Sequence, residues 1–229
     1  MAFFPELVGL PLETLTQAFD SPPSPADAAP AEDPFLWFSE VALAIAQDGE
    51  AGVNWLLHHL PEDDEDRLRA VLFALSSVEG DLRDQRRSQL EQFLLAVLAD
   101  QRPLIVAEAV DGLTALDCAD ALDRVLPLLA HDSPYVVGSV LRFLARHHPE
   151  KARPALLLAL KSAEPIIRQN AVDELDELDY VEALPALRRL LNDEDGYVRQ
   201  AAQTAVSNLG AGKVSGTDIA NHEIRNIGS

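Results

Sequence analysis

The sequence contains few of the residues that would tie it to a membrane or to an oxidising compartment. Its 229 residues include a single cysteine, Cys118, so no disulfide can form within the chain. No apolar run approaches the ~20 residues that a membrane-spanning helix needs. The opening stretch MAFFPELVGLPLETL has no lysine or arginine and includes Pro5, Glu6 and Pro11, which makes it a poor signal peptide. We therefore expect a cytoplasmic protein with no membrane partner.

Basic side chains are also scarce. Lys and Arg number 18 against 38 Asp and Glu, which gives a formal net charge of -20. A field of this sign repels phosphate backbones and anionic lipid headgroups, so nucleic acid and membrane surfaces are disfavoured as partners. A basic protein partner is compatible with it. Hydrophobic residues make up 48% of the chain, which is enough to build a core.

What the sequence does contain is a repeat of 31 residues. Four segments at this spacing begin with a proline or glycine and continue with two large residues: PLIVAEAVDGL (103–113), PYVVGSVLRFL (134–144), PIIRQNAVDEL (165–175) and GYVRQAAQTAV (196–206). Agreement of several columns at one fixed spacing indicates an internal repeat. The best repeats are 86–116, 117–147, 148–178 and 179–210.

Each repeat is predicted to be a pair of helices. In the last one, apolar residues recur at helical spacing over 181–191, residues 192–195 form an acidic turn, and a second helix follows over 196–210. The pattern loosens upstream, where we expect a second helix over 34–47, a turn and second helix over 61–78, and first helices over 11–19 and 50–60. The sequence thus predicts one domain over 1–210, with a Pro-rich insertion at 20–33 and a flexible tail over 211–229.

These units resemble HEAT repeats, in the short variety found in phycobilin lyase subunits and many bacterial proteins. The stretch LLNDEDGYVRQAAQTAVSNLG (190–210) carries the resemblance best. The resemblance implies an all-α, right-handed α-solenoid of about six helix pairs, in which the second helices line the concave side. It also implies that the recurring Arg69, Arg168 and Arg199 pair with acidic turn residues of neighbouring units.

Two exposed columns of the second helices are the candidate binding surface. They combine acidic, basic and polar side chains, which are either a solvated face or contacts for a protein partner. The candidate contacts are Asp111, Arg142, Arg146, Asp173, Glu177, Gln200, Thr204 and Asn208. Two acidic runs, 62–66 and 173–179, are either solvated edges or landing sites for a basic partner.

The sequence offers no convincing catalytic or cofactor site. The pairs His58–His59 and His147–His148 are adjacent on their helices, so neither chelates a metal well by itself. Some HEAT-like oxygenases hold iron through recurring His-Glu pairs on their second helices, and the corresponding positions here contain none. Cys118 has no recognisable catalytic partner and is expected to be buried. We therefore expect no catalytic residue, no cofactor and no metal, and predict that the protein is not an enzyme.

Three functions remain open from the sequence. The leading one is an interaction scaffold or adaptor that binds a basic protein on an acidic-polar concave surface. An inhibitor or immunity-type protein that mimics an acidic substrate is a sharper version of it. The third, which rests on the repeat resemblance alone, is a subunit of a bilin lyase or a related chromophore-handling enzyme.

Overall fold

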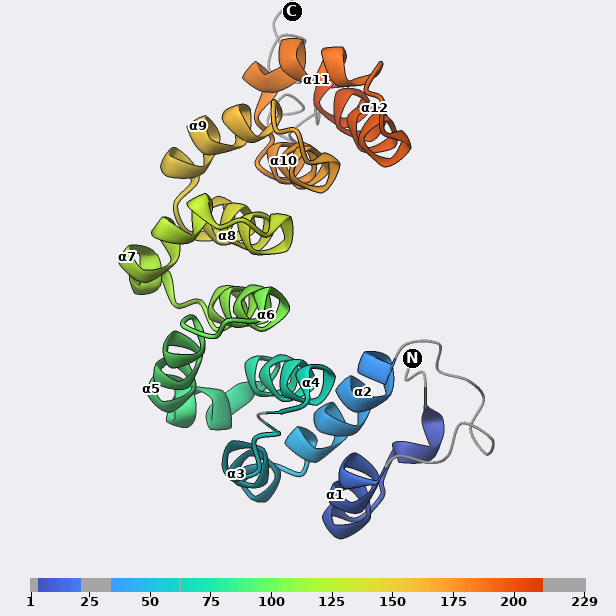
Figure 1. Cartoon of the computed structure of the whole chain (residues 1–229), viewed down its shortest axis with the longest axis vertical. Coiled ribbons are helices and arrows are strands. Elements are labelled where there is room, and N and C mark those ends of the chain that lie inside the picture. Colours follow the sequence, from blue (N-terminus) through green and yellow to red (C-terminus); the bar gives the residue numbers. More distant parts are fainter. Residues whose placement is uncertain (1–3, 22–33, 62, 212–229) are drawn as a thin grey trace, which may run out of the picture. The chain divides into compact units, whose positions relative to one another are not determined.

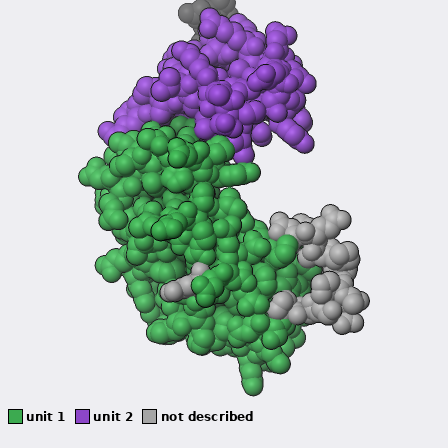
Figure 2. Space-filling view, viewed as in Figure 1, with its two compact units in different colours: residues 1–148 green, residues 149–229 purple. Residues whose placement is uncertain are grey.

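The computed structural model describes residues 4–21, 34–61 and 63–211. Within these ranges the chain forms twelve α-helices and four short 3-10 helices, and no strand. The chain divides into two compact units, residues 1–148 and residues 149–229 (Figure 2). Each unit is described by itself.

The first unit contains eight α-helices. In chain order its elements are η1 (Pro5–Leu7), α1 (Leu12–Asp20), α2 (Pro34–Gln47), α3 (Glu50–His58), α4 (Glu65–Ser76), α5 (Gly80–Val97), α6 (Pro103–Ala115), η2 (Ala119–Ala121), α7 (Leu122–Val125), η3 (Leu126–Ala130) and α8 (Pro134–His147). Helices α2, α4, α6 and α8 pack one on the next in a row, while α3, α5 and α7 lie along the other side of this row (Figure 1). We call α2, α4, α6 and α8 the second helices of this unit.

The core of the first unit lies where consecutive second helices meet each other and their first-helix partners. Helix α6 buries a set of apolar residues on its packed faces: Ile105, Val106, Ala109, Val110 and Leu113. Helices α6 and α8 begin with proline, which has no N–H. The helix loses no hydrogen bond there, because the N–H at its first position has no acceptor within the helix. The apolar side chains therefore stack into one continuous core, as a helical repeat requires.

Helices in the upstream part of this unit differ from those of the regular repeats in length and in how closely they approach. Helix α5 has 18 residues, whereas its counterpart α9 has 11, and this difference shifts everything upstream out of phase. Helix α3 also crosses α2 at Gly52, where an added Cβ would lie 1.7 Å from the carbonyl oxygen of Ile45. Only glycine permits this approach of the two backbones.

The second unit contains α9 (Pro149–Ala159), α10 (Pro165–Glu177), η4 (Val181–Ala183), α11 (Leu184–Leu190) and α12 (Gly196–Gly210). Its second helices, α10 and α12, pack on each other, α9 packs on α10, and α11 packs on α12. The side chain of Asp195 accepts hydrogen bonds from the N–H groups of Tyr197 and Val198 and so caps the start of α12.

Helices α6 and α10 end in the same way. Asp117 and Asp179 adopt left-handed conformations, with φ of 55° and 49°. In each case the N–H of the next residue donates to the carbonyl five residues earlier, at 3.0 and 3.1 Å. This is a Schellman ending with aspartate in the place where glycine is usual. The two aspartates are two repeat lengths apart, so the period extends to the turn geometry.

The predicted all-α solenoid fold is confirmed. The described residues form six helix pairs, and the expected second helices over 34–47 and 196–210 begin and end at those residues. The continuity of one domain over 1–210 stays a prediction. Most of the Pro-rich insertion at 20–33 and nearly all of the predicted tail lie outside the described residues.

Candidate functional site

The candidate contacts all lie on second helices, and most of them are exposed. Asp111 belongs to α6 and is half-buried, while Arg142 and Arg146 of α8 are exposed. In the second unit, Asp173 and Glu177 of α10 are exposed. So are three polar residues of α12: Gln200, Thr204 and Asn208.

In the first unit, α6 and α8 are joined by a polar cluster across this face. Arg142 Nη1 donates to Asp111 Oδ1 at 2.5 Å, and Ser139 Oγ donates to Asp111 Oδ2 at 2.9 Å. Both oxygens of the carboxylate are therefore engaged by the next second helix. Asp111 and Arg142 neutralise each other to a large extent, so the predicted acidic ladder is less acidic here than its sequence suggests.

Glu108 lies one turn before Asp111 on α6 and faces Arg69 of α4. Its Oε2 is 3.8 Å from Arg69 Nε, and its side chain is only 16% exposed. Burial raises the pKa of Glu108 to about 7, with a further rise from Asp111 and opposing effects of Arg69 and Arg142. Glu108 is thus a carboxyl group that changes charge near neutral pH, at the centre of the α4–α6–α8 face.

One aromatic ring contacts this cluster, and another aromatic side chain is exposed on α8. The guanidinium carbon of Arg69 lies 4.1 Å from the ring centroid of Phe35 on α2, a cation–π contact that fixes the arginine. Tyr135, at the start of α8, is 53% exposed. An exposed tyrosine beside charged groups is a frequent anchor in protein interfaces.

Arg146 contacts the end of α6 rather than Asp111. Its Nη2 is 3.8 Å from Asp117 Oδ1, and Arg83 of α5 donates to Asp117 Oδ2 at 3.0 Å. Arg87 donates to the backbone oxygen of Asp117 at 2.7 Å. Three arginines therefore stabilise the C-terminal end of α6, which gives Arg146 a structural contact besides its predicted role.

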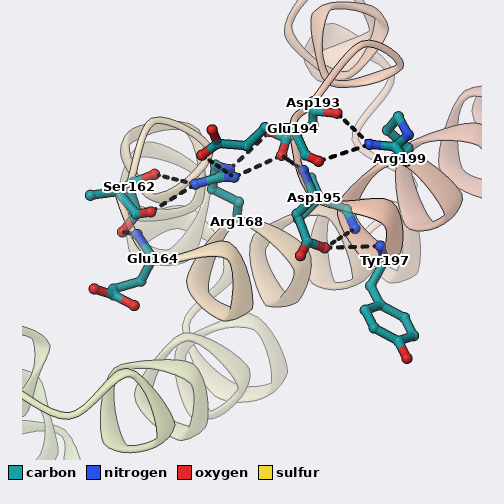
Figure 3. A network of polar contacts seen from close by, with 10 residues as sticks. Ser162, Glu164, Arg168, Asp193, Glu194, Asp195, Tyr197 and Arg199 are labelled. Atoms are coloured by element: carbon teal, nitrogen blue, oxygen red, sulfur yellow. Dashed lines mark hydrogen bonds and ion pairs between the residues drawn. The ribbon is translucent and has the colours of Figure 1, made fainter.

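In the second unit the face of α10 and α12 carries amide and hydroxyl groups. Asn208 Nδ2 donates to Asp176 Oδ2 at 2.7 Å and so joins the two helices. Thr204 Oγ1 donates to the carbonyl of Gln200 at 3.2 Å, within α12. Tyr197 at the start of α12 is 72% exposed and points away from the neighbouring polar network (Figure 3).

The arginine column is structural, and its three members differ. Arg168 pairs with the turn residue Asp193 of the next repeat through Nη2 and Nε, at 2.7 and 2.9 Å, as expected (Figure 3). Arg199 donates to the carbonyls of Asp193 and Glu194 in its own turn. Arg69 approaches Glu108, which lies in a helix of the next unit, and Asp66 of its own helix. The expected pairing with acidic turn residues of neighbouring units is therefore wrong for Arg69 and Arg199.

Sequence reasoning missed Glu108, Ser139 and Tyr135. Glu108 and Ser139 share one repeat column, which continues as Asn170 and Ala201. The side chains of this column carry a carboxyl, a hydroxyl, an amide and a methyl group, so no functional group recurs that would mark it as a site. A signal was present in the spacing, because residues three apart on a helix share a face and Glu108 precedes Asp111 by three.

The described residues do not form a metal site. Within residues 4–21, 34–61 and 63–211, no group of three or more His, Cys, Asp and Glu side chains is arranged to hold a metal ion. His148 Nε2 lies 3.0 Å from the carbonyl oxygen of Ala119, which is a structural contact. Cys118 is 2% exposed, as expected, and burial raises the pKa of its thiol. The donor groups described here therefore do not fit the iron site of HEAT-like oxygenases.

Over the described residues, no helix is both long enough and apolar enough to span a bilayer.

Comparison with solved structures shows the fold. An engineered protein aligns with 87% of this chain and 96% of its own, with a TM-score of 0.55 and 18% identity. A designed armadillo repeat protein, solved in complex with the peptide (KR)4, aligns with 87% of this chain and all of its own, with a TM-score of 0.53 and 20% identity. At sequence identities this low, the comparison supports a similarity of fold and nothing more.

Comparison with curated proteins corrects one prediction. A deoxyhypusine hydroxylase of Cryptococcus neoformans is 29% identical over 113 residues. The match covers 47% of this chain and 29% of that protein, so the chain spans less than a third of this relative's length. The relative is an enzyme, which contradicts the prediction that this protein is not one.

The family described as HEAT repeats matches residues 153–215, which include α10, α11 and α12. The match covers the stretch 190–210 that carries the resemblance most clearly. The predicted resemblance to HEAT repeats is therefore confirmed, and it is strongest over residues 153–215.

Proposed function

We propose that the protein is an interaction scaffold whose second-helix faces bind a basic segment of a partner protein. The observation that carries the proposal is the exposed polar face that the second helices keep within each unit. On this face the first unit carries Asp111 of α6 and the exposed Tyr135 of α8, and the second unit carries the exposed Glu177 of α10 and Tyr197 of α12.

The charge distribution supports a basic partner. Residues 1–148 contain 25 acidic side chains against nine arginines and no lysine. Paired charges such as Asp111–Arg142 reduce the local field, but the acidic side chains of this unit far outnumber its arginines. A surplus of one sign speeds the approach of an oppositely charged partner and selects against nucleic acid.

Binding of a basic partner near Glu108 should be accompanied by release of a proton. A cation placed near its carboxyl group favours the ionised form, so binding near pH 7 should release a proton. The neighbouring Asp111 and Arg142 lie on the same face and act on the same group. The designed armadillo neighbour, solved with the peptide (KR)4, provides a suitable probe.

The test is a binding measurement with a fluorescent (Lys-Arg)4 peptide. Asp111→Lys and Glu177→Lys reverse charges on the second-helix faces. Asp120→Lys on η2 and Glu150→Lys on α9 make the same change in net charge on first helices. We expect at least about tenfold weaker binding for the first pair and less than about threefold for the second, with binding weakening as salt is raised. Equal losses in all four variants, or no binding at all, would refute the proposal.

The match to deoxyhypusine hydroxylase favours a second candidate, an enzyme with hydroxylase activity. Its test is incubation of the protein with a deoxyhypusine-containing protein and iron, followed by mass spectrometry of the product. An added oxygen atom that depends on this protein would establish the activity. An unchanged substrate mass, with a control hydroxylase active in the same assay, would exclude it.

A further inference from the structure

Helix α2 separates two hollows at the N-terminal end of the first unit. It packs against η1 and α1 on one side and against α4 on the other (Figure 1). One hollow, of about 530 Å³, is lined by α2 together with η1, the loop after it and α1. The other, of about 440 Å³, is lined by α2, the end of α4 and the start of α5.

The two hollows share Leu43 and Gln47 of α2. Leu43 is half-buried and Gln47 is exposed at the C-terminal end of the helix. Apolar groups continue from this centre in both directions, as Leu10 in the first hollow and Val78 in the second. We call this surface the α2 trough, defined by Leu10, Leu43, Gln47 and Val78. Its extent suits a chain segment with several side chains better than a single small molecule.

Every ionisable group that lines the trough is a carboxylate. Glu40 and Asp48 line the first hollow, Glu79 lines the second, and neither hollow includes Lys, Arg or His. Among the described residues, no basic side chain forms an ion pair with any of the three. Helices α2 and α4 also end here, at Gln47 and Ser76, and the C-terminal end of a helix carries partial negative charge.

The apolar lining is open to solvent in the first hollow, whereas Val78 of the second hollow is 7% exposed. Val8, which lines the first hollow, is 73% exposed. An apolar floor surrounded by uncompensated negative charge attracts a ligand that has both an apolar side and cationic groups. Apolar contacts supply the affinity of such a complex, and the charges supply its orientation and rate.

We propose that the α2 trough is a docking site for an amphipathic basic segment of a partner protein, with its apolar side chains on Leu43 and its Lys or Arg groups beside Glu40, Asp48 and Glu79. This site goes beyond the proposed function, because it needs none of the second-helix contacts around Asp111 or Glu177. It also requires apolar side chains in the ligand, which the second-helix face does not.

The experiment compares two synthetic peptides on the full chain. One is an amphipathic 16-residue peptide of Leu and Lys, and the other is (Lys-Arg)4, which has no apolar side. Binding is measured by fluorescence anisotropy and located by hydrogen exchange. The Leu-Lys peptide should protect residues 40–49 and 74–82, whereas (Lys-Arg)4 should leave these segments unprotected.

Gln47 provides matched variants, because it is exposed and lies between both hollows. Gln47→Arg should weaken binding of the Leu-Lys peptide at least about tenfold, whereas Gln47→Glu should leave it within about threefold or tighten it. Leu43→Ala should also weaken binding, and a circular dichroism spectrum would show that the variant stays folded. Equal affinities of the two Gln47 variants, or protection confined to 104–115 and 135–146, would overturn this proposal and leave the proposed function standing.

Discussion

Replacing Arg168 by methionine should be among the most damaging single changes in the second unit. Its guanidinium makes two hydrogen bonds to the carboxylate of Asp193 and two more, at 2.9 and 3.0 Å, to the carbonyls of Ser162 and Ala163 (Figure 3). The side chains of Arg168 and Asp193 are 7% and 8% exposed. One residue thus joins the turns before α10 and α12, which belong to successive repeats.

The magnitude follows from what the substitution leaves behind. Methionine keeps the length of the side chain but removes the arginine donor from two carbonyl groups and from a buried carboxylate, to which only the N–H of Asp195 is then seen to donate among the described residues. Removing one partner of a buried ion pair costs about 3–5 kcal/mol. Glu194, which also approaches Arg168, is 86% exposed, so water reaches one side of the network. We therefore expect Arg168→Met to cost about 3 kcal/mol, at the lower end of that range.

Hydrogen exchange is the suitable assay, because Trp37 and Trp55 both belong to the first unit and report nothing on the second. A loss of about 3 kcal/mol should speed exchange of the slowest amides of α10 and α12 about a hundredfold. Arg199→Met is the matched control, since this exposed arginine bonds only to carbonyls of its own turn, and it should cost less than about 1 kcal/mol.

A double-mutant cycle tests the reasoning directly. Asp193→Asn also breaks the pair, and the double variant should lose clearly less than the sum of the two single losses, because no charge is left unpaired. Additive losses, or a cost of Arg168→Met no larger than that of Arg199→Met, would refute the assignment of stability to this pair.

Three further predictions concern pH and packing. Arg168 holds the pKa of Asp193 below its usual 3.8. The stability that this pair contributes is therefore complete above pH 3.8 and is lost as the pH falls below that value. Arg168→Met should abolish this acid-dependent loss of stability, measured by urea unfolding. Burial raises the pKa of Glu108 from 4.5 to about 7. The unfolding free energy of the native protein should therefore fall by about 3 kcal/mol relative to that of Glu108→Gln as the pH rises from 4.5 to 8. A difference in unfolding free energy that does not change with pH would contradict this. Gly52→Ala should cost about 3 kcal/mol in urea unfolding followed by tryptophan fluorescence, since the new methyl group meets the backbone of α2, whereas Gly210→Ala meets open space and should change stability by less than about 1 kcal/mol.

The repeat was predictable because its signals are local. Proline at the start of α6, α8 and α10 and apolar residues at helical spacing mark each second helix without reference to the rest of the chain. The pairing of Arg168 with Asp193 was accessible by analogy, since both residues lie at fixed places in the repeat. The length of α5 was not predicted, because no capping signal marks its start at Gly80.

The polar cluster of the first unit could not be derived in the same way. Its geometry depends on which side chains of α4, α6 and α8 face one another, and a column of residues does not give this. Asp111 and Arg142 occupy one column and were expected to be separate exposed contacts, yet they bond to each other. Glu108 owes its raised pKa to burial by neighbouring helices, which is a tertiary effect.

The distribution of charge connects these findings. Asp111, Glu108 and the turn residue Asp193 are each approached by an arginine of a second helix. The carboxylates of the α2 trough have no such arginine among the described residues, although the same unit supplies arginines elsewhere. Like charges left unpaired around an apolar surface repel one another and destabilise the fold. A cationic partner that binds beside them relieves this repulsion. The unpaired carboxylates of the α2 trough therefore make it a second place, besides the second-helix faces, where a basic partner gains from binding.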